Sequence, residues 1–480
     1  MIIVPLLALA ATPQPLVGHQ TIDRPFTAQP SAIEGITELH TTRDWHADLR
    51  GIDSLLVNDF FLDQDCSVIL ELERRDVVDP RADLRLGEEG ELDAPDVVTL
   101  GGRVAGDPGS IAYLAFSDSM TMGFVQTDGE QYVISSGPAD QDLPTVVYNL
   151  GDISNNTISL RDIACQTIEV PGMQSLSIEA PTTARRGVVP CRVVDVAIDT
   201  DTEFRTDLFG GNAGDAADYI TMLTAAISEV YERDLNVKLN ITFARVWTST
   251  DPWNQGGTVD QLFQFEDYWN ANMTGVARDN AHFFSGRGLG GGVAYVGAIC
   301  KDYSYALSAN FNGFFPYPLQ NQSTQNWDFM VTAHEWGHNF GAPHTHQQSP
   351  LANIDNCGNG TCDNLPGTIM SYCHTCGNGT GDVNLNFHPQ NINSYMLAYL
   401  DNSGQWSGAG APCDLTGDPL CNDDPCGTAD TNGDGQLTPA DFNAWILAFN
   451  NQSPECDQNG DGNCNPGDFN AWVLNYNAGC

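Results

Sequence analysis

Positive charge is scarce in this sequence. Its 480 residues contain 19 lysines and arginines against 62 aspartates and glutamates, and lysine occurs only as Lys238 and Lys301. The formal net charge is −43 at pH 7. Because so acidic a surface repels phosphate groups, the composition excludes nucleic acids and anionic membranes as principal partners. Part of the acidic excess is explained by predicted calcium ligands near the C-terminus.

Long hydrophobic runs are also missing. The apolar segment Met1–Ala11 contains a small-residue cleavage signal at Ala8-Leu9-Ala10, and it predicts an export signal over residues 1–18, although it lacks the usual basic start. No other apolar run approaches the roughly 20 residues that a membrane-spanning helix needs. The 14 cysteines are even in number and predict disulfides formed in an oxidising compartment. We therefore expect a secreted protein without a transmembrane segment.

The segment from His334 to His344 reads HEWGHNFGAPH. On a helix, His334 and His338 lie on one face, so both imidazoles can reach one zinc ion. Gly341 lets the chain leave the helix sharply, and His344 can return as the third ligand. Glu335 is placed beside them to take a proton from a water molecule. Three imidazoles leave one ligand position open, which indicates a single catalytic zinc rather than a closed structural site.

A second motif, Thr-Ile-Met-Ser-Tyr at residues 368–372, follows the histidines. With HExxHxxGxxH followed by a methionine turn, the chain resembles the metzincin metallopeptidases. The resemblance implies that Met370 forms a hydrophobic floor beneath the histidines; its position after the zinc motif disfavours ordinary core as the explanation. It also implies that Tyr372 can bind zinc or steady an oxyanion, as in the astacin and serralysin branches.

Other segments resemble the adamalysin/reprolysin branch of that family. Residues 281–286 and 292–300 are similar to the two strands before the zinc helix, and the second is implied to be an edge strand that binds substrate in extended form. Residues 100–110 and 129–134 are similar to that branch's propeptide. Tyr372 departs from the reprolysin pattern, which usually has a proline nearby, so the subfamily stays open.

Patterning divides the chain into domains. Residues 19–186 contain short alternating strands such as 67–72 and 111–116, which predict a β-rich propeptide. It ends at Arg185-Arg186, either a processing site or a pair of surface charges. Residues 187–402 alternate strands and helices in the order βαβαββα. Alternation predicts the first two strands at 194–198 and 237–243, and a helical period predicts a long helix at 219–231. This order agrees with the α/β (α+β) catalytic domain of a metzincin, with a twisted mixed sheet and a zinc helix.

Several cysteines and histidines allow two interpretations. In an exported protein, disulfides are favoured over a second zinc site for the four cysteines that follow the third histidine. Cys66 or Cys165 can supply a thiolate that blocks the zinc of a latent enzyme, but neither lies in a switch motif and a disulfide is favoured. His374 and His388 are substrate-pocket or surface residues, with the surface favoured. The four clustered cysteines are Cys357, Cys362, Cys373 and Cys376.

Residues 413–480, after a Gly/Ser-rich linker at 403–412, contain a repeat. Each copy is a twelve-residue loop followed by Phe-Asn-Ala-Trp, with oxygen-bearing side chains where EF-hand loops bind calcium. Two calcium ions are therefore predicted. Their ligands are Asp430, Asn432, Asp434, Gln436, Thr438 and Asp441 in the first loop, and Asp457, Asn459, Asp461, Asn463, Asn465 and Asp468 in the second.

The twelfth loop residue is aspartate rather than glutamate, and no amphipathic helix precedes the first loop. Both features resemble a dockerin. The resemblance implies a small α-helical, EF-hand-like domain that binds a cohesin-like or cell-surface partner. The alternative is that the calcium loops and disulfides only stabilise a domain with too little core. The repeated aromatic residues form either a docking face or a core, and a core is favoured.

These features predict a secreted zinc endopeptidase, made as a zymogen, that hydrolyses peptide bonds in protein substrates. Glu335 is the expected general base, and substrate is expected to lie along residues 292–299 through backbone hydrogen bonds. The alternative is a catalytically inactive metzincin-fold protein that serves binding or surface attachment. The presence of Glu335 and all three histidines favours the enzyme.

Overall fold

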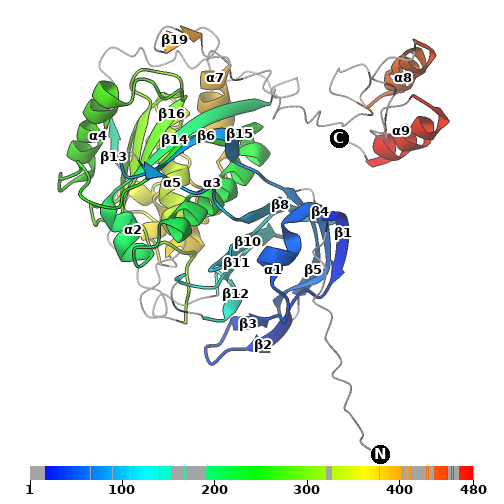
Figure 1. The fold of residues 1–480 in the computed structure, drawn as a ribbon, viewed down its shortest axis with the longest axis horizontal. Helices are drawn as coiled ribbons and strands as arrows, with labels where there is room; N and C mark the ends of the chain where they lie inside the picture. The colour runs from blue at the N-terminus through cyan, green and yellow to red at the C-terminus, as the bar shows by residue number, and fades with distance from the viewer. Residues whose placement is uncertain are drawn as a thin grey trace, which may run out of the picture. The chain divides into compact units, whose positions relative to one another are not determined.

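The computed structural model describes residues 17–152 except 65, 89, 108, 140 and 142, then 166–168, 191–319, 327–401 except 378, and parts of 407–478. The chain divides into two compact units (Figure 1). Unit 1 comprises residues 1–182 and 194–413, and unit 2 comprises residues 183–193 and 414–480. None of the helices in these ranges is both long and apolar enough to cross a membrane.

A ten-stranded sheet, the N-terminal sheet, forms the first part of unit 1. β5 and β9 confirm the alternating strands predicted at 67–72 and 111–116, and their inward side chains, such as Leu70 and Leu114, are buried. The strand order is β1-β4-β5-β8-β9-β10-β11-β12-β3-β2. The elements are β1 (Val17–Asp23), β2 (Thr27–Pro30), β3 (Ile36–His40), α1 (Trp45–Leu49), β4 (Gly51–Asp63), β5 (Cys66–Arg74), β8 (Val98–Val104), β9 (Ile111–Phe116), β10 (Thr121–Thr127), β11 (Glu130–Ser135) and β12 (Thr145–Asn149).

A second sheet of eight strands, the central sheet, has the order β13-β17-β18-β16-β14-β15-β6-β7. The strands predicted around 194–198, 237–243, 281–286 and 292–300 are confirmed as β14, β15, β16 and β17. β18 is missing from the predicted order because four residues give too short a pattern. The elements are β6 (Val78–Leu86), β7 (Gly90–Glu91), β13 (Gln166–Ile168), β14 (Arg192–Thr200), β15 (Val237–Val246), β16 (Asn280–Phe284), β17 (Gly292–Tyr295) and β18 (Tyr305–Ser308).

Helices pack on the central sheet. The longest, α3 (Ala213–Leu235), begins where the Asn212 side chain accepts hydrogen bonds from Gly214 and Asp215, and it ends at Asn236 with a left-handed φ of 53°. The others are α2 (Thr202–Leu208), α4 (Thr258–Asn272), α5 (Trp327–Asn339) and a closing helical stretch of α6 (Pro389–Asn391), a π-turn (Ile392–Met396) and α7 (Leu397–Leu400). Short 3₁₀ turns lie at Cys357–Asn359, Cys373–Thr375 and Gly379–Asp382, and a small ladder joins β19 (Ser407–Gly408) to β20 (Ala411–Pro412).

Both edges of the central sheet are formed by N-terminal segments. β6 runs parallel to β15, with Asp83 opposite Phe243 and Leu86 opposite Val246 (Figure 1). At the other edge, Gln166–Ile168 runs parallel to β17. The sequence had assigned these segments to a propeptide separate from the catalytic domain. The structure instead makes them strands of the same sheet as β14 to β18.

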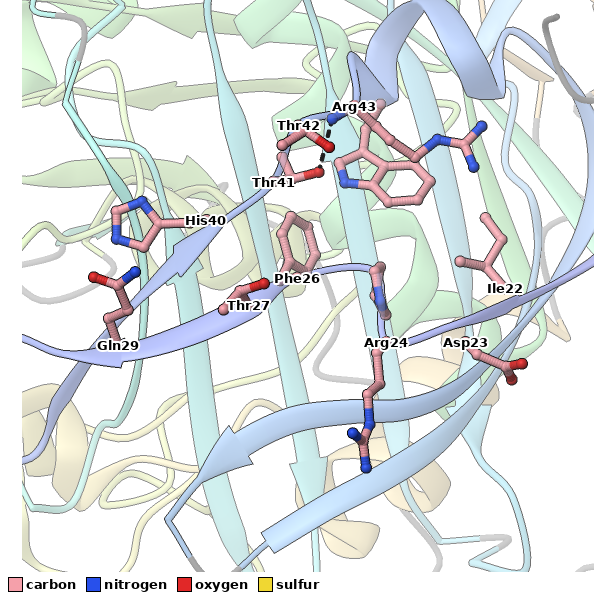
Figure 2. A pocket seen from close by; sticks show the side chains of 12 residues that line it. Ile22, Asp23, Arg24, Phe26, Thr27, Gln29, His40, Thr41, Thr42 and Arg43 are labelled. Carbon is pink, nitrogen blue, oxygen red and sulfur yellow. Dashed lines mark hydrogen bonds between the residues drawn. The ribbon is translucent and has the colours of Figure 1, made fainter. Parts of the chain in front are cut away.

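A surface pocket of about 400 Å³ lies beside β1, β2 and β3 (Figure 2). Its lining runs from Ile22 to Trp45 and includes none of the predicted site residues. Its two arginines are already ion-paired, Arg24 with Asp59 and Arg43 with Asp48. The pocket is therefore not a candidate for the predicted chemistry.

The described part of unit 2 contains two helices, α8 (Pro439–Asn451) and α9 (Pro466–Ala478). Trp445 and Trp472 are buried, and their indole nitrogens donate to the Cys456 carbonyl at 3.2 Å and the Ala429 carbonyl at 3.1 Å. The Phe442 ring lies 5.1 Å from that of Trp472. The two tryptophans and the partly buried Phe442 thus form a small core, as the sequence favoured, whereas Phe469 is exposed.

Candidate metal centre

Three histidines converge at the end of α5. His334 and His338 lie one turn apart on this helix, and His344 returns after the chain turns at Gly341, whose φ is 97°. The Nε2 atoms of His334 and His344 each lie 3.1 Å from Nε2 of His338. Tetrahedral bonds of about 2.0–2.1 Å to zinc place neighbouring ligand nitrogens roughly 3.3 Å apart. The observed spacing therefore fits one zinc ion.

Each imidazole is oriented by a hydrogen bond from its other nitrogen. Carbonyl and amide oxygens only accept, so each Nδ1 carries the hydrogen and each Nε2 presents a lone pair. The three Nδ1 atoms donate to the Ile369 carbonyl at 2.7 Å from His334, to the Ala342 carbonyl at 2.7 Å from His338, and to the Gln347 side-chain oxygen at 3.1 Å from His344.

Burial also keeps the three rings neutral. It lowers the pKa of His334 and His338 well below the usual value and lowers that of His344 to about 4. Neutral imidazole is the form that binds zinc. The site therefore presents three metal-competent nitrogens near neutral pH.

Glu335 lies against β17. Its side chain is fully buried, and a Cβ added at Gly292 would lie 2.3 Å from its Oε1 atom. The missing side chain at Gly292 thus makes the space in which the carboxylate sits. The sequence did not identify Gly292, because this contact joins residues far apart in the chain and leaves no local pattern.

Met370 packs directly against the zinc helix. A Cβ at Gly337 would lie 2.4 Å from its sulfur, and the Thr345 amide donates to the Met370 carbonyl at 3.0 Å. Met370 is fully buried. Its position beneath α5 agrees with the floor that the resemblance implied.

Tyr372 belongs to an aromatic cluster around the third histidine. Its ring centroid lies 4.7 Å from that of His344 and 4.8 Å from that of His346. His346 stacks on His344 with an interplanar angle of 12°. Sequence reasoning missed His346, because one histidine two residues beyond a ligand forms no recognisable motif. His374 also belongs to this cluster, with its ring centroid 5.7 Å from that of Tyr372.

His388 has a structural role in the described part of the chain. Its Nδ1 accepts a hydrogen bond from the Gln390 amide at 3.1 Å and so caps α6. It is half-buried. This placement differs from that of a plain surface histidine.

The clustered cysteines form disulfides, as the sequence favoured. Cys357 pairs with Cys373 and Cys362 with Cys376, so they make no second zinc site. The disulfide favoured for Cys66 is wrong, because this residue is a free thiol. Burial raises its pKa, which disfavours the thiolate that binds metal. Cys165 lies outside the described residues.

Of the predicted calcium ligands, the structure describes Thr438, Asp441, Asn465 and Asp468. Asp441 and Asp468 are fully buried and occupy matching positions. The Asp441 carboxylate accepts the Thr438 amide at 2.7 Å, and the Asp468 carboxylate accepts the Asn465 amide at 2.7 Å. The calcium sites stay a prediction, since eight ligands lie outside the described residues: Asp430, Asn432, Asp434, Gln436, Asp457, Asn459, Asp461 and Asn463.

Comparison with known proteins agrees with the geometry of the histidine site. Residues 191–382 match the family model described as Metallo-peptidase family M12. The chain is 26% identical over 242 residues to disintegrin and metalloproteinase domain-containing protein 9 of Homo sapiens, covering 48% of this chain and 28% of the relative. It is 25% identical over 284 residues to disintegrin and metalloproteinase domain-containing protein B of Aspergillus fumigatus, covering 50% and 34%.

A solved structure, metalloproteinase-II from Bacteroides fragilis, aligns with 80% of this chain and 99% of its own, at 10% identity and a TM-score of 0.40. That score is too low to bear on the fold. The chain spans only 28% and 34% of the two curated relatives, so their full domain content does not transfer to it. Within the matched range, residues 191–382 are similar to the metallopeptidases of family M12.

Proposed function

We propose that this protein is a secreted zinc endopeptidase that cleaves peptide bonds in protein substrates. One observation carries the proposal: three neutral imidazoles converge closely enough to bind a single ion, with the Glu335 carboxylate next to them in the chain and packed against β17 of the central sheet. The family match over residues 191–382 supports the same chemistry.

The residues divide the work of hydrolysis. His334, His338 and His344 would hold the zinc ion, which would supply Lewis acidity that lowers the pKa of a water to roughly 7. Glu335 accepts the proton of the attacking water and passes it to the leaving amine. Tyr372, whose ring packs on that of His344, is proposed to steady the developing oxyanion with its hydroxyl.

We propose further that the enzyme is made as a zymogen, with residues 19–186 as propeptide and 187–402 as catalytic domain. β13 supports this, because the Ile168 carbonyl accepts a hydrogen bond from the Val296 amide at 3.3 Å. Residues 166–168 thus lie along the strand predicted to bind substrate. Arg185-Arg186, the proposed processing site, lies outside the described residues.

For residues 413–480 we propose a dockerin-like module that binds two calcium ions and attaches the enzyme to a cohesin-like or cell-surface partner. The matched environments of Asp441 and Asp468 support the internal repeat. Calorimetry of the full chain should detect two calcium ions, and Asp441→Ala with Asp468→Ala should remove both. Unchanged calcium binding in that double variant contradicts the assigned loops.

The test of the peptidase is digestion of an unfolded protein by the processed chain. We expect cleavage that a zinc chelator abolishes and added zinc restores. Glu335→Ala should lose cleavage while it keeps its zinc and its melting temperature. Asp207→Ala, which changes an exposed carboxylate within residues 187–402, serves as the matched control.

Two outcomes contradict the proposal. A folded, zinc-loaded, processed protein that cleaves no substrate favours the inactive binding protein. Full activity of the Glu335→Ala variant removes the assigned general base.

A further inference from the structure

We infer that residues 17–149, the N-terminal module, are a lasting partner of the peptidase domain and stay bound without a covalent link after the chain is cut between 150 and 190. The inference rests on the proposed processing of the chain. It differs from that proposal in one respect: processing does not release the N-terminal module. Cutting then yields a two-chain enzyme, in which the module remains on the β15 edge of the central sheet.

The first support is the strand that the module adds to the central sheet. The Ile241 amide donates to the Val77 carbonyl at 2.6 Å, and the Gly87 amide donates to the Val246 carbonyl at 2.8 Å. The Arg85 guanidinium also lies 5.2 Å from the centre of the Phe243 ring. Departure of the module would leave β15 as an open edge with a row of unpaired backbone groups.

A second support is the buried polar contact between the N-terminal sheet and the peptidase domain. Tyr113 and Tyr148 are at most 1% exposed, so this interface is as dry as a domain core. Their side chains and two neighbours donate to main-chain carbonyls of the peptidase domain: Tyr113 to Met222 at 2.7 Å, Tyr148 to Pro316 at 3.0 Å, Ser135 to Phe315 at 2.6 Å, and Gln131 to Val383 at 2.9 Å.

The third support is an ion pair between the N-terminal module and the peptidase domain. Arg75, which follows β5, donates to the Glu229 carboxylate of α3 at 2.8 Å, with side chains 21% and 8% exposed. A Cβ at Gly101 of β8 would lie 1.9 Å from a Glu229 oxygen, so the glycine makes room for this carboxylate. Separation of the module would leave Glu229 without its partner and expose the surface around it.

These contacts act without a disulfide. The only cysteine between residues 17 and 149 is Cys66, and it is free. The module is therefore joined covalently to the peptidase domain only through the main chain that follows residue 149. Once that connection is cut, the contacts described above are what hold the two parts together.

The test uses the full chain carrying Glu335→Ala, with a site-specific protease recognition sequence inserted after Asp152. After cutting, we expect both fragments to elute as one species in gel filtration and native mass spectrometry, and to separate only in denaturant. Separation in native buffer, with the larger fragment soluble or aggregated, overturns the inference. Since this variant is not expected to cleave peptides, the result is independent of the proposed function, whose failure is loss of Glu335-dependent cleavage.

Two matched variants test whether the Arg75–Glu229 ion pair stabilises the association of the two fragments. Arg75→Met should lower the urea concentration at which the cut fragments separate. Arg103→Met should leave it unchanged, because Arg103 pairs with Glu71 on the exposed face of the same sheet. If the cut fragments of both variants separate at the same urea concentration, the role given to the Arg75–Glu229 pair is contradicted.

Discussion

The two edges of the central sheet carry strands of unequal extent. β13 covers β17 with three residues, Gln166–Ile168, close to Glu335. β6 is nine residues long and joins β15 in a region that also holds a buried ion pair and several buried hydroxyl contacts. The difference indicates that the edge beside the reacting groups can be vacated at small cost, while the opposite edge carries stability. Substitutions near β17 should therefore change activity, and substitutions at the N-terminal module should change stability.

The largest effect is expected from Gly292→Ala, which tests whether a change at β17 alters activity without altering stability. A methyl group there would lie 2.3 Å from Oε1 and 2.6 Å from Cγ of Glu335, so this side chain must move, which shifts the general base. We expect kcat to fall about 100-fold, the order expected for a 1 Å misplacement, with zinc content and melting temperature unchanged.

Gly288→Ala is the control for that variant. A Cβ at Gly288 meets only an Asn310 side-chain atom at 3.8 Å, an ordinary contact. It should leave kcat unchanged. A Gly292→Ala enzyme with normal kcat, or one whose loss of activity follows a loss of stability, contradicts the separation of the two edges.

A smaller effect is expected from Tyr372→Phe. This change keeps the ring that packs on His344 and His346 and removes only the hydroxyl. Loss of a sole oxyanion donor costs about 10²–10³ in kcat, but zinc shares the charge here, so we expect about tenfold. Steady-state kinetics should show the loss in kcat with KM and zinc content retained. An unchanged kcat assigns Tyr372 to packing alone.

The smallest effect is on pH-dependent stability, through Asp218 of α3. Its carboxylate accepts the Asp96 amide of the N-terminal module at 3.0 Å, and burial, with Asp215 and Asp96 nearby, raises its pKa to about 7. Between the unfolded value of about 3.9 and about 7, the folded state binds more protons than the unfolded state. This group's contribution to stability is therefore present at low pH and is lost as pH rises through that window.

Asp218→Asn should flatten this decline while keeping an oxygen that accepts the Asp96 amide. Melting temperatures measured at about pH 4, 5.5 and 7 check the slope, and activity should not change. Asp207→Asn, at an exposed site on α2, is the control. If the melting temperatures of both variants fall equally with pH, Asp218 does not cause the pH dependence of stability.

Local patterns made the zinc helix predictable. The spacing of His334, His338 and His344 encodes geometry directly, because a helix and one glycine turn suffice to bring the rings together. The long helix of α3 and the strands β14 and β15 followed from their periodicity in the same way.

Contacts between distant segments could not be predicted. Nothing in Val78–Leu86 indicates that it pairs with a strand more than 150 residues later, since alternation shows that a strand exists and not which partner it takes. The same holds for Gly292, whose importance lies in the side chain that it accommodates, and for His346, which matters by stacking on a neighbour.

The rings of His334 and His338 are aimed by the peptide carbonyls of Ile369 and Ala342 rather than by side chains. A main-chain acceptor survives every substitution that preserves the local backbone. The side chains at positions 342 and 369 can thus vary without turning the histidine rings away from the metal. Randomised libraries at these two positions should retain zinc in most folded members, whatever happens to their cleavage preference.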